Sequence, residues 1–251
     1  MKKCAIVTGA ASGIGKAVAE ALAQEGHHVV VADVNEEQGL SVAEKISGHF
    51  VKADLAQRAS CRQLVDAAIE EYGRVDILIN NAGFQHVSPI EEFPEEKWEQ
   101  MLSVMLTAPF LLTKHAWPYM KEQGWGRIVN IASIHALVAS PNKVGYISAK
   151  HGLIGLTRAA GVEGGSCGIT VNALCPSYVR TPLVEGQIAD QARANNIAED
   201  EVIAKIMLKS AAIKNIIGPG EISDLVMFLC SDKGRSITGA SWTIDCGWTA
   251  Q

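Results

Sequence analysis

Residues 4–15 read CAIVTGAASGIG, a short apolar run followed by a turn with glycines at positions 9, 13 and 15. The apolar run is typical of a short buried strand, and an amphipathic pattern then continues to about Glu25, where Gly26 ends it. Turns need glycine whatever they bind, so the glycines alone are weak evidence. Their place between a strand and a helix is more informative, because backbone amides there can approach a pyrophosphate at the positive end of the helix dipole. The stretch therefore predicts a dinucleotide site.

A second strand-like run, residues 29–32, ends in Asp33. An acidic side chain at this point can bind the adenosine ribose hydroxyls and would repel a phosphate in their place. Asp33 therefore favours NAD over NADP as the cofactor. The alternative is a helix-capping aspartate that contacts no ligand.

Strand and helix patterns alternate along the rest of the amino-terminal half. Helices are expected over residues 36–47 and up to Tyr72, with strands near residues 50–51 and over residues 75–79. Such alternation with short connections predicts an α/β fold, a single-domain doubly wound parallel sheet of Rossmann-like type spanning residues 1–251. Ligands bind such sheets beyond the carboxyl ends of the strands. Five polar or glycine positions fall at expected strand ends, namely Gly9, Asp33, Asp54, Asn81 and Ser133.

The stretch from Ser133 to Lys150 carries the residues best suited to chemistry. Tyr146 and Lys150 stand four apart on an expected helix and share one face, and Ser133 follows the apolar run of residues 128–131. The three groups suit proton transfer to or from a carbonyl oxygen. A nearby lysine cation and an oxidised nicotinamide would lower the tyrosine pKa from about 10 by roughly three units, which requires about 4 kcal/mol. The alternative is that Tyr146 is a packed aromatic ring and Lys150 a solvated surface charge, with no part in chemistry.

Composition excludes several other classes of protein. The net charge is −5 without a block of Lys or Arg, which disfavours nucleic acid and anionic membranes as partners. Six scattered cysteines show no Cys-x-x-Cys and no zinc spacing, so we expect no metal site. We expect the cysteines to be reduced thiols in a cytoplasmic protein. We find no signal-peptide pattern and no apolar run long enough to span a bilayer.

Residues 8–15, residues 80–83 and Ser133 with Tyr146-x-x-x-Lys150 together resemble the short-chain dehydrogenase/reductase family, over essentially the whole chain. Residues 85–87, 89–98, 149–152, 181–184 and 247–248 look like its (R)-3-hydroxybutyrate dehydrogenase branch. That likeness implies reversible, NAD-dependent oxidation of 3-hydroxybutyrate to acetoacetate, a reaction of ketone body metabolism, in a homotetramer. Composition and periodicity do not reveal the substrate.

The resemblance assigns roles to individual positions. Tyr146 matches the general base, Ser133 the substrate-orienting serine and Lys150 the lysine that holds the nicotinamide ribose. The implied cofactor contacts are Thr8, Gly9, Ser12, Gly13, Ile14, Gly15, Asp33, Asp54, Leu55, Asn81, Ala82, Gly83, Tyr146, Lys150, Pro176, Val179 and Thr181. The implied substrate contacts are Gln85, Ser133, His135, Lys143, Tyr146, Tyr178, Gln187 and Trp248.

The polar members of the substrate set also make chemical sense together. A small β-hydroxy acid must present its hydroxyl to Tyr146 while its carboxylate is held nearby. Lys143 would supply a cation, and Gln85, His135 and Gln187 could supply neutral donors. Singly, each side chain has a bland alternative as a surface or loop residue. Tyr178 and Trp248 would close over the methyl end.

Three positions depart from the family pattern. Met105 stands where an asparagine is expected, Ser177 where a glycine is, and Tyr178 where a tryptophan is. Methionine cannot donate a hydrogen bond, so we expect hampered proton escape. Residues 183–217 are expected to form a helical excursion that serves as a substrate lid. Alternatives that stay open are another short hydroxy acid, a polyol, a β-ketoacyl thioester, or a catalytically weak NAD-binding module.

Overall fold

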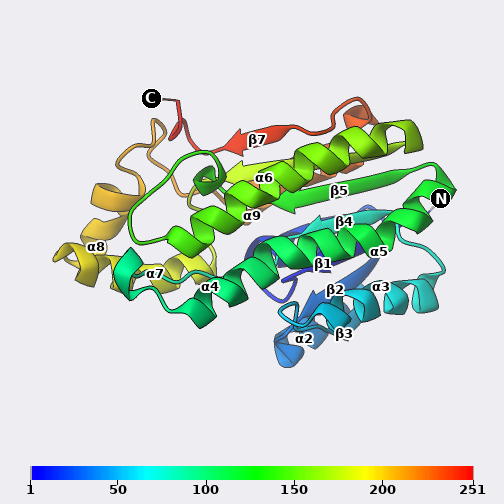
Figure 1. Ribbon diagram of the computed structural model, residues 1–251, viewed down its shortest axis with the longest axis horizontal. Coiled ribbons are helices and arrows are strands. Elements are labelled where there is room, and N and C mark those ends of the chain that lie inside the picture. Colours follow the sequence, from blue (N-terminus) through cyan, green and yellow to red (C-terminus); the bar gives the residue numbers. More distant parts are fainter. Residues whose placement is uncertain (1, 251) are drawn as a thin grey trace.

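A seven-stranded parallel sheet forms the centre of the computed structural model, which describes residues 2–250 apart from the side chains of Asp190, Ala194 and Asn195 (Figure 1). The strand order is β3-β2-β1-β4-β5-β6-β7. Their bounds are Cys4–Thr8 for β1, His28–Asp33 for β2, His49–Lys52 for β3, Ile77–Asn80 for β4, Gly126–Ile131 for β5, Ile169–Pro176 for β6 and Ser241–Ile244 for β7. The doubly wound parallel sheet expected from the sequence is confirmed.

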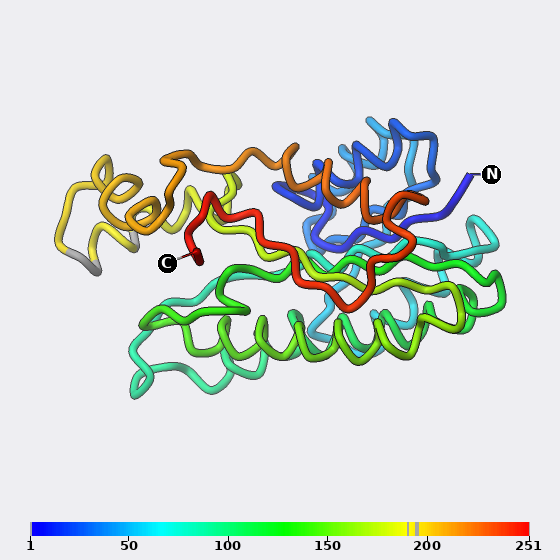
Figure 2. The backbone as a smooth tube through the Cα atoms, turned by 90° about the horizontal axis from the view of Figure 1, so that it is seen from above, coloured from blue at the N-terminus to red at the C-terminus, as the bar shows by residue number. Residues whose placement is uncertain are grey.

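Helices cover both faces of the sheet, so the molecule has three layers (Figure 2). One face carries α1 (Gly13–Gln24), α2 (Glu36–Ile46) and α9 (Pro219–Cys230) over an apolar core that includes Val7, Val31 and Ile79. The other face carries α3 (Arg58–Tyr72), α5 (Ala108–Gln123) and α6 (Val144–Gly164), whose core includes Ile6 and Leu78. Alternate residues of one strand thus enter opposite cores, as the period of a strand requires. Within residues 2–250, no helix combines the length and apolarity that crossing a membrane requires.

The order of the strands reverses between β1 and β4, which pair with each other while β2 lies on the outer side of β1. Connections from the two strands leave in opposite directions at such a point and open a crevice beyond the carboxyl ends. Figure 1 shows that α7 (Pro182–Asn195) and α8 (Glu199–Val202) lie beyond this same end of the sheet. The topology therefore directs the search for a site to one edge of the molecule.

The excursion after β6 is only partly helical. After α8 comes a π-helical turn over Ile203–Met207, but residues 208–217 are irregular, which corrects the expectation of helix up to Ile217. Lys214 Nζ donates to the carbonyls of Leu208 and Lys209, and Ile217 pairs with Val179 in an extended bridge. These contacts hold the backbone out of helical geometry. They also bring the two ends of the excursion together.

Candidate active site

The glycine turn after β1 is shaped by close backbone approaches. Gly9 and Gly13 have φ of +63° and +55°, a region that favours glycine. A Cβ at Gly9 would lie 2.9 Å from Ala82 Cα, and a Cβ at Gly15 would lie 2.2 Å from the Gly9 carbonyl oxygen. The missing side chains let the turn pack closely against the end of β4. Gly13 and Ile14 at the amino end of α1 line the cavity, which fits a bound pyrophosphate.

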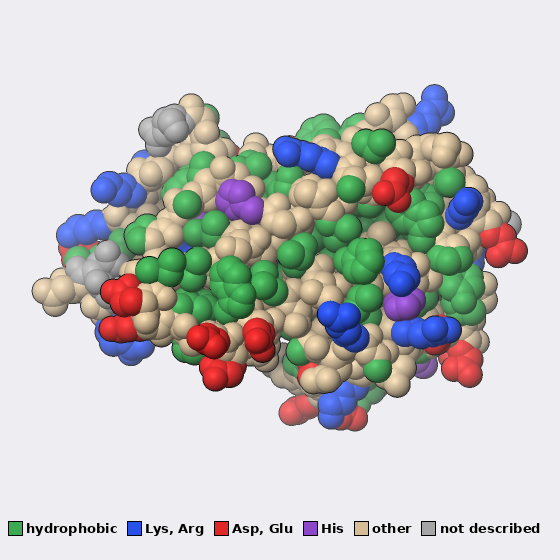
Figure 3. All heavy atoms as spheres, viewed as in Figure 1, with side chains coloured by type: hydrophobic (Ala, Val, Ile, Leu, Met, Phe, Trp, Pro, Cys, Tyr) green, Lys and Arg blue, Asp and Glu red, His purple; other side chains and the backbone are tan. Residues whose placement is uncertain are grey.

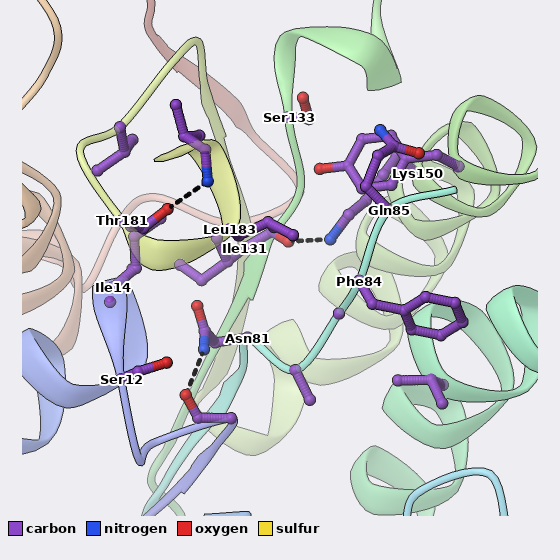
Figure 4. Close-up of a pocket in the computed structure, with 18 of the residues that line it drawn as sticks. Ser12, Ile14, Asn81, Phe84, Gln85, Ile131, Ser133, Lys150, Thr181 and Leu183 are labelled. Atoms are coloured by element: carbon purple, nitrogen blue, oxygen red, sulfur yellow. Dashed lines mark hydrogen bonds between the residues drawn. The ribbon is translucent and has the colours of Figure 1, made fainter. Parts of the chain in front are cut away.

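Thr8 and Asn81 tie this turn to the end of β4. Thr8 Oγ1 accepts from the backbone N–H groups of Asn81 and Ala82 at 2.9 and 3.1 Å, and Asn81 Nδ2 donates to the carbonyls of Thr8 and Gly9 at 2.9 and 3.1 Å. Thr8 is buried and does not line the cavity, and neither does Gly15. Both therefore support the cofactor crevice from behind. Asn81, in contrast, reaches the wall (Figure 4).

Asp33 lies at the carboxyl end of β2, on the wall of the cavity. Its Oδ2 accepts from Ala11 N at 2.9 Å and its Oδ1 accepts from Asn35 N at 3.0 Å. Two backbone donors thus fix the carboxylate where β2 meets the glycine turn. Asp54 also reaches the wall, where its Oδ1 accepts from Ala56 N at 3.0 Å.

A buried polar relay anchors α6 to the sheet. Asn80 Nδ2 donates to Asn130 Oδ1, Asn130 Nδ2 donates to Thr157 Oγ1, and Thr157 Oγ1 donates to the Leu153 carbonyl, each at 2.8 Å. The relay fixes the rotation of α6, the helix that carries Tyr146 and Lys150. Sequence reasoning missed it, although an asparagine inside the apolar strand of residues 126–131 was a visible signal.

Ser133, Tyr146 and Lys150 all line the cavity at the carboxyl end of β5, as the sequence predicted. Ser133 and Lys150 are labelled in Figure 4. Lys150 is 4% exposed, and its Nζ donates to the Ile131 carbonyl at 2.7 Å and lies 5.6 Å from the centroid of the Tyr146 ring. Ser133 Oγ accepts from His135 N at 3.1 Å, which leaves the Ser133 hydroxyl proton available to another partner. The tyrosine and the ammonium thus lie on the same side of the crevice.

Burial by the protein alone acts on the charge states of Tyr146 and Lys150, whereas the expectation from the sequence combined the lysine with an oxidised nicotinamide. Burial raises the pKa of Tyr146 to about 12, against a smaller lowering by its hydrogen bond with Ser133. Burial also lowers the pKa of Lys150 to about 8. The phenolate is therefore not favoured by the lysine alone, because desolvation by the surrounding protein outweighs a single cation whose own charged form is disfavoured.

Lys143 precedes α6 and is 4% exposed, with its Nζ 5.9 Å from the centroid of the Tyr178 ring. Burial lowers the pKa of Lys143. We find no carboxylate within ion-pair distance of its ammonium among the residues that the structure describes. A buried cation without a counter-ion, placed on the wall of a cavity, is suited to bind an anionic group of a ligand.

Two glutamines flank the same part of the cavity with their amides oriented by local bonds. Gln85 Oε1 accepts from His86 N at 3.0 Å, so its two N–H groups remain free to donate. Gln187 Nε2 donates to the Leu183 carbonyl at 3.2 Å, which leaves a second N–H. Both amides can therefore present donors to an anion.

His135 is 5% exposed and lies beside Tyr146, with ring centroids 6.2 Å apart. Its Nε2 lies 2.8 Å from Ser140 Oγ. Burial, followed by the charges of Lys143 and His151, lowers the pKa of His135 to about 4, so the ring is neutral near pH 7. Trp248 stands 6.4 Å from His135 between ring centroids but does not line the cavity itself.

Most of the predicted site residues line one cavity of about 420 Å³. Of the residues predicted from the sequence, only Thr8, Gly15 and Trp248 are absent from its wall. Wall residues that the sequence did not suggest include Phe84, Gln100 and Val104. All three are uncharged and resemble ordinary helix or loop residues, so nothing in the sequence marked them.

Met105 occupies a π-helical turn, η2 (Ser103–Thr107), between α4 (Glu95–Leu102) and α5. It is 1% exposed and packs with Met101, Ala149 and the half-buried Tyr146. A π-turn inside a helix often accompanies a functional site. Here its inward position is filled by a thioether, which packs in the apolar cluster behind the cavity wall and offers Tyr146 no hydrogen-bond donor.

Comparisons with known proteins agree with this geometry. A family model described as enoyl-(acyl carrier protein) reductase matches residues 9–249. The uncharacterized oxidoreductase YxjF of Bacillus subtilis is 45% identical over 255 residues, covering 100% of this chain and 99% of the relative. Two proteins named D-beta-hydroxybutyrate dehydrogenase are also similar. That of Rhizobium meliloti is 42% identical with 100% of each chain covered, and that of Cupriavidus necator is 39% identical with 99% and 98% covered.

Proposed function

The chain belongs to the short-chain dehydrogenase/reductase family of oxidoreductases, and we propose that it catalyses the reversible NAD-dependent oxidation of (R)-3-hydroxybutyrate to acetoacetate. The observation that carries the substrate class is Lys143, whose buried ammonium faces the cavity near Tyr146 without a carboxylate partner in the described part of the chain. Burying an unpaired cation costs free energy that an anionic ligand would offset. Relatives named for hydroxybutyrate support the same substrate.

The chain's own residues divide the work as follows. Lys143 binds the carboxylate, and Gln85, His135 and Gln187 add neutral donors, so the hydroxyl of a β-hydroxy acid is directed at Tyr146. Ser133 Oγ holds the substrate oxygen, and Tyr146 Oη takes its proton. Lys150 holds the nicotinamide ribose and stabilises the charge that develops on the phenol. When bound, NAD supplies the acceptor for the hydride that leaves the carbinol carbon.

Asp33 supports NAD as the nicotinamide cofactor. Its carboxylate is fixed by two backbone donors at the carboxyl end of β2, where the adenosine ribose of a dinucleotide lies in this fold. A 2′-phosphate placed there would face a fixed negative charge. The other proposed contacts, from the glycine turn to Thr181, surround the same crevice.

The excursion of residues 183–217 is proposed to close over the substrate. Leu183, Val184 and Gln187 of α7 line the cavity. Backbone bonds hold the far end of the excursion to the rest of the fold, where Ile217 N donates to the Tyr178 carbonyl at 3.0 Å and Ala212 N donates to the Cys246 carbonyl at 2.8 Å. Closure predicts slower proteolysis of this segment with NAD and substrate present. Unchanged proteolysis would count against a lid.

The protein is further proposed to assemble as a homotetramer and to act in the cytoplasm. Exposed apolar side chains on the outer helices, including Phe110 of α5 at 48% and Val162 of α6 at 83%, support burial against further copies of the chain. Apolar side chains are visible between charged ones across this face in Figure 3. Sedimentation velocity at micromolar concentration tests the tetramer, and a monomer would contradict it.

The decisive experiment measures NAD reduction at 340 nm with each enantiomer of 3-hydroxybutyrate, with shorter and longer hydroxy acids, and with a polyol, and repeats the best case with NADP. The proposal expects the highest kcat/KM for the (R) enantiomer with NAD. A second candidate is another short hydroxy acid, favoured by the hydroxyl that Tyr178 adds to the wall. A higher kcat/KM for a different acid would select it, and NAD binding without turnover would indicate a weak binding module.

A further inference from the structure

The loop between β5 and α6 holds two neighbouring polar side chains, His135 and Ser140. The position of the proton between them decides whether His135 presents a hydrogen-bond donor or an acceptor to a ligand in the cavity. His135 Nε2 and Ser140 Oγ lie 2.8 Å apart. His135 lines the cavity, whereas the half-buried Ser140 does not. Any influence of Ser140 on a bound molecule must therefore pass through the imidazole.

A neutral imidazole has one donor nitrogen and one acceptor nitrogen. His135 is neutral near pH 7 because burial lowers its pKa to about 4. Its Nε2 is engaged with Ser140, and within residues 2–250 we find no hydrogen-bond partner for its Nδ1. If Nε2 carries the proton and donates to Ser140, Nδ1 is a bare lone pair. If Ser140 donates its hydroxyl proton to Nε2, Nδ1 carries an N–H.

The two tautomers treat a carboxylate in opposite ways. A carboxylate only accepts hydrogen bonds, so it is repelled by a lone pair and attracted by an N–H. The ammonium of Lys143 on the same wall has the reverse preference when no anion is present. A serine hydroxyl can rotate to donate or accept, and it can therefore satisfy Nε2 in either state.

We propose that Ser140 is a positioning residue that donates its hydroxyl proton to His135 Nε2 when a carboxylate occupies the cavity, which places a proton on Nδ1 for donation to that carboxylate. The inference rests on the proposed function only in that the ligand is a carboxylate. It predicts a role for a residue that contacts neither the substrate nor the cofactor.

Ser140→Ala removes the donor, so the Nδ1–H tautomer loses its support and the KM for (R)-3-hydroxybutyrate rises. We expect a rise of about tenfold, equivalent to about 1.4 kcal/mol, while kcat stays within about twofold because Tyr146 and Lys150 are untouched. Ser140→Gly should act like Ser140→Ala, and Ser140→Thr, which keeps a hydroxyl, should restore the wild-type KM. Ser88→Ala is the matched control, because the exposed Ser88 hydroxyl donates to the Pro89 carbonyl at 3.3 Å outside the cavity.

The tautomer itself is read by nitrogen-15 NMR of the NAD-bound, histidine-labelled protein during titration with butyrate, a carboxylate without a hydroxyl to oxidise. The protein has seven histidines, and His135→Asn assigns the relevant signal by its loss. The proposal expects the Nδ1–H form in the butyrate complexes of the wild type and Ser140→Thr but not of Ser140→Ala. This readout does not depend on turnover, so it remains decisive if no 3-hydroxy acid is oxidised.

The proposal is overturned by an Nε2–H signal in the wild-type butyrate complex, by a wild-type KM in both hydroxyl-free variants, or by a raised KM in Ser140→Thr. A loss of kcat rather than of substrate affinity in a variant that melts like the wild type would also reject it, since it would place Ser140 in the chemical step.

Discussion

Replacing Lys143 with methionine removes the ammonium while keeping a flexible side chain of similar length. The replacement should lower activity and raise the stability of the fold. A hydrogen bond to a charged group contributes about 1.5–3 kcal/mol. Since 1.36 kcal/mol corresponds to a factor of ten, the kcat/KM for (R)-3-hydroxybutyrate should fall by about 10- to 150-fold. The loss should appear chiefly in KM, because the ammonium binds the carboxylate in the ground state and in the transition state alike.

Stability should change in the other direction. Burial lowers the pKa of Lys143, which means that folding disfavours its charged form. At a pH below that lowered pKa the lysine is charged in both states and its penalty is fully present, and the penalty fades as the pH rises toward the ordinary value of 10.5. Lys143→Met should therefore unfold at a higher urea concentration than the wild type at pH 7, and the difference should shrink as the pH rises toward 10.5.

Initial rates of NADH formation give kcat/KM for the acid and for the neutral alcohol 2-butanol. The control is Lys45→Met, which removes an exposed ammonium 2.8 Å from Glu20, far from the cavity wall. The reasoning is refuted if Lys143→Met lowers the acid and the neutral alcohol equally, since a charge-specific contact cannot do that. It is also refuted if the variant is less stable than the wild type at pH 7, because the ammonium would then have a partner that stabilises it.

Three further changes probe the surroundings of the site. Met105→Asn should raise kcat, measured by NADH formation, because it places a hydrogen-bonding amide in the cluster that packs on Tyr146. It should also lower the melting temperature, because an amide enters an apolar cluster. An unchanged kcat would mean that another group or water already carries the proton. Cys246→Gly should stabilise the fold by about 0.5–1 kcal/mol in urea unfolding, because Cys246 has φ of +56° and glycine adopts that region freely; the comparison Asn196→Gly should change little, since asparagine tolerates it. His135→Gln should reduce acid destabilisation: the ordinary pKa of 6.5 falls to about 4 on folding, so the unfolded state binds the extra proton and the wild type loses stability as the pH drops through this window. The wild type should lose about 2 kcal/mol of unfolding free energy between pH 7 and pH 5. An equal loss of stability in the wild type and in His135→Gln would reject this prediction.

The positions of the strand ends could be predicted because each is marked by local chemistry. The apolar run before Asp33 and the one before Asn81 stop at polar residues, and in a parallel sheet such ends share one edge. The glycine turn was equally visible, since Gly9 and Gly13 adopt backbone angles that other residues avoid. Fold and cofactor crevice follow from short-range patterns of this kind.

The charge states of the site could not be predicted in the same way. Spacing places Tyr146 and Lys150 on one helix face, but their pKa values depend on how much water the surrounding protein excludes. The orientation of α6 depends likewise on Asn80, Asn130 and Thr157, which meet only after β4 and β5 have paired. The sequence shows long-range contacts of this type at most as an isolated polar residue within an apolar strand.

The opposed shifts of Tyr146 and Lys150 have a consequence for when the general base exists. A phenol with a pKa of about 12 beside an amine with a pKa of about 8 holds its proton near pH 7, so the protein alone does not offer a phenolate. An additional positive charge close to the ring would lower the tyrosine pKa, and each 1.36 kcal/mol of such stabilisation lowers it by about one unit. Oxidised nicotinamide carries that charge, whereas reduced nicotinamide does not. The same buried tyrosine would therefore be a base when alcohol is to be oxidised and an acid when ketone is to be reduced, and the oxidation state of the cofactor, rather than a second protein group, would decide between the two.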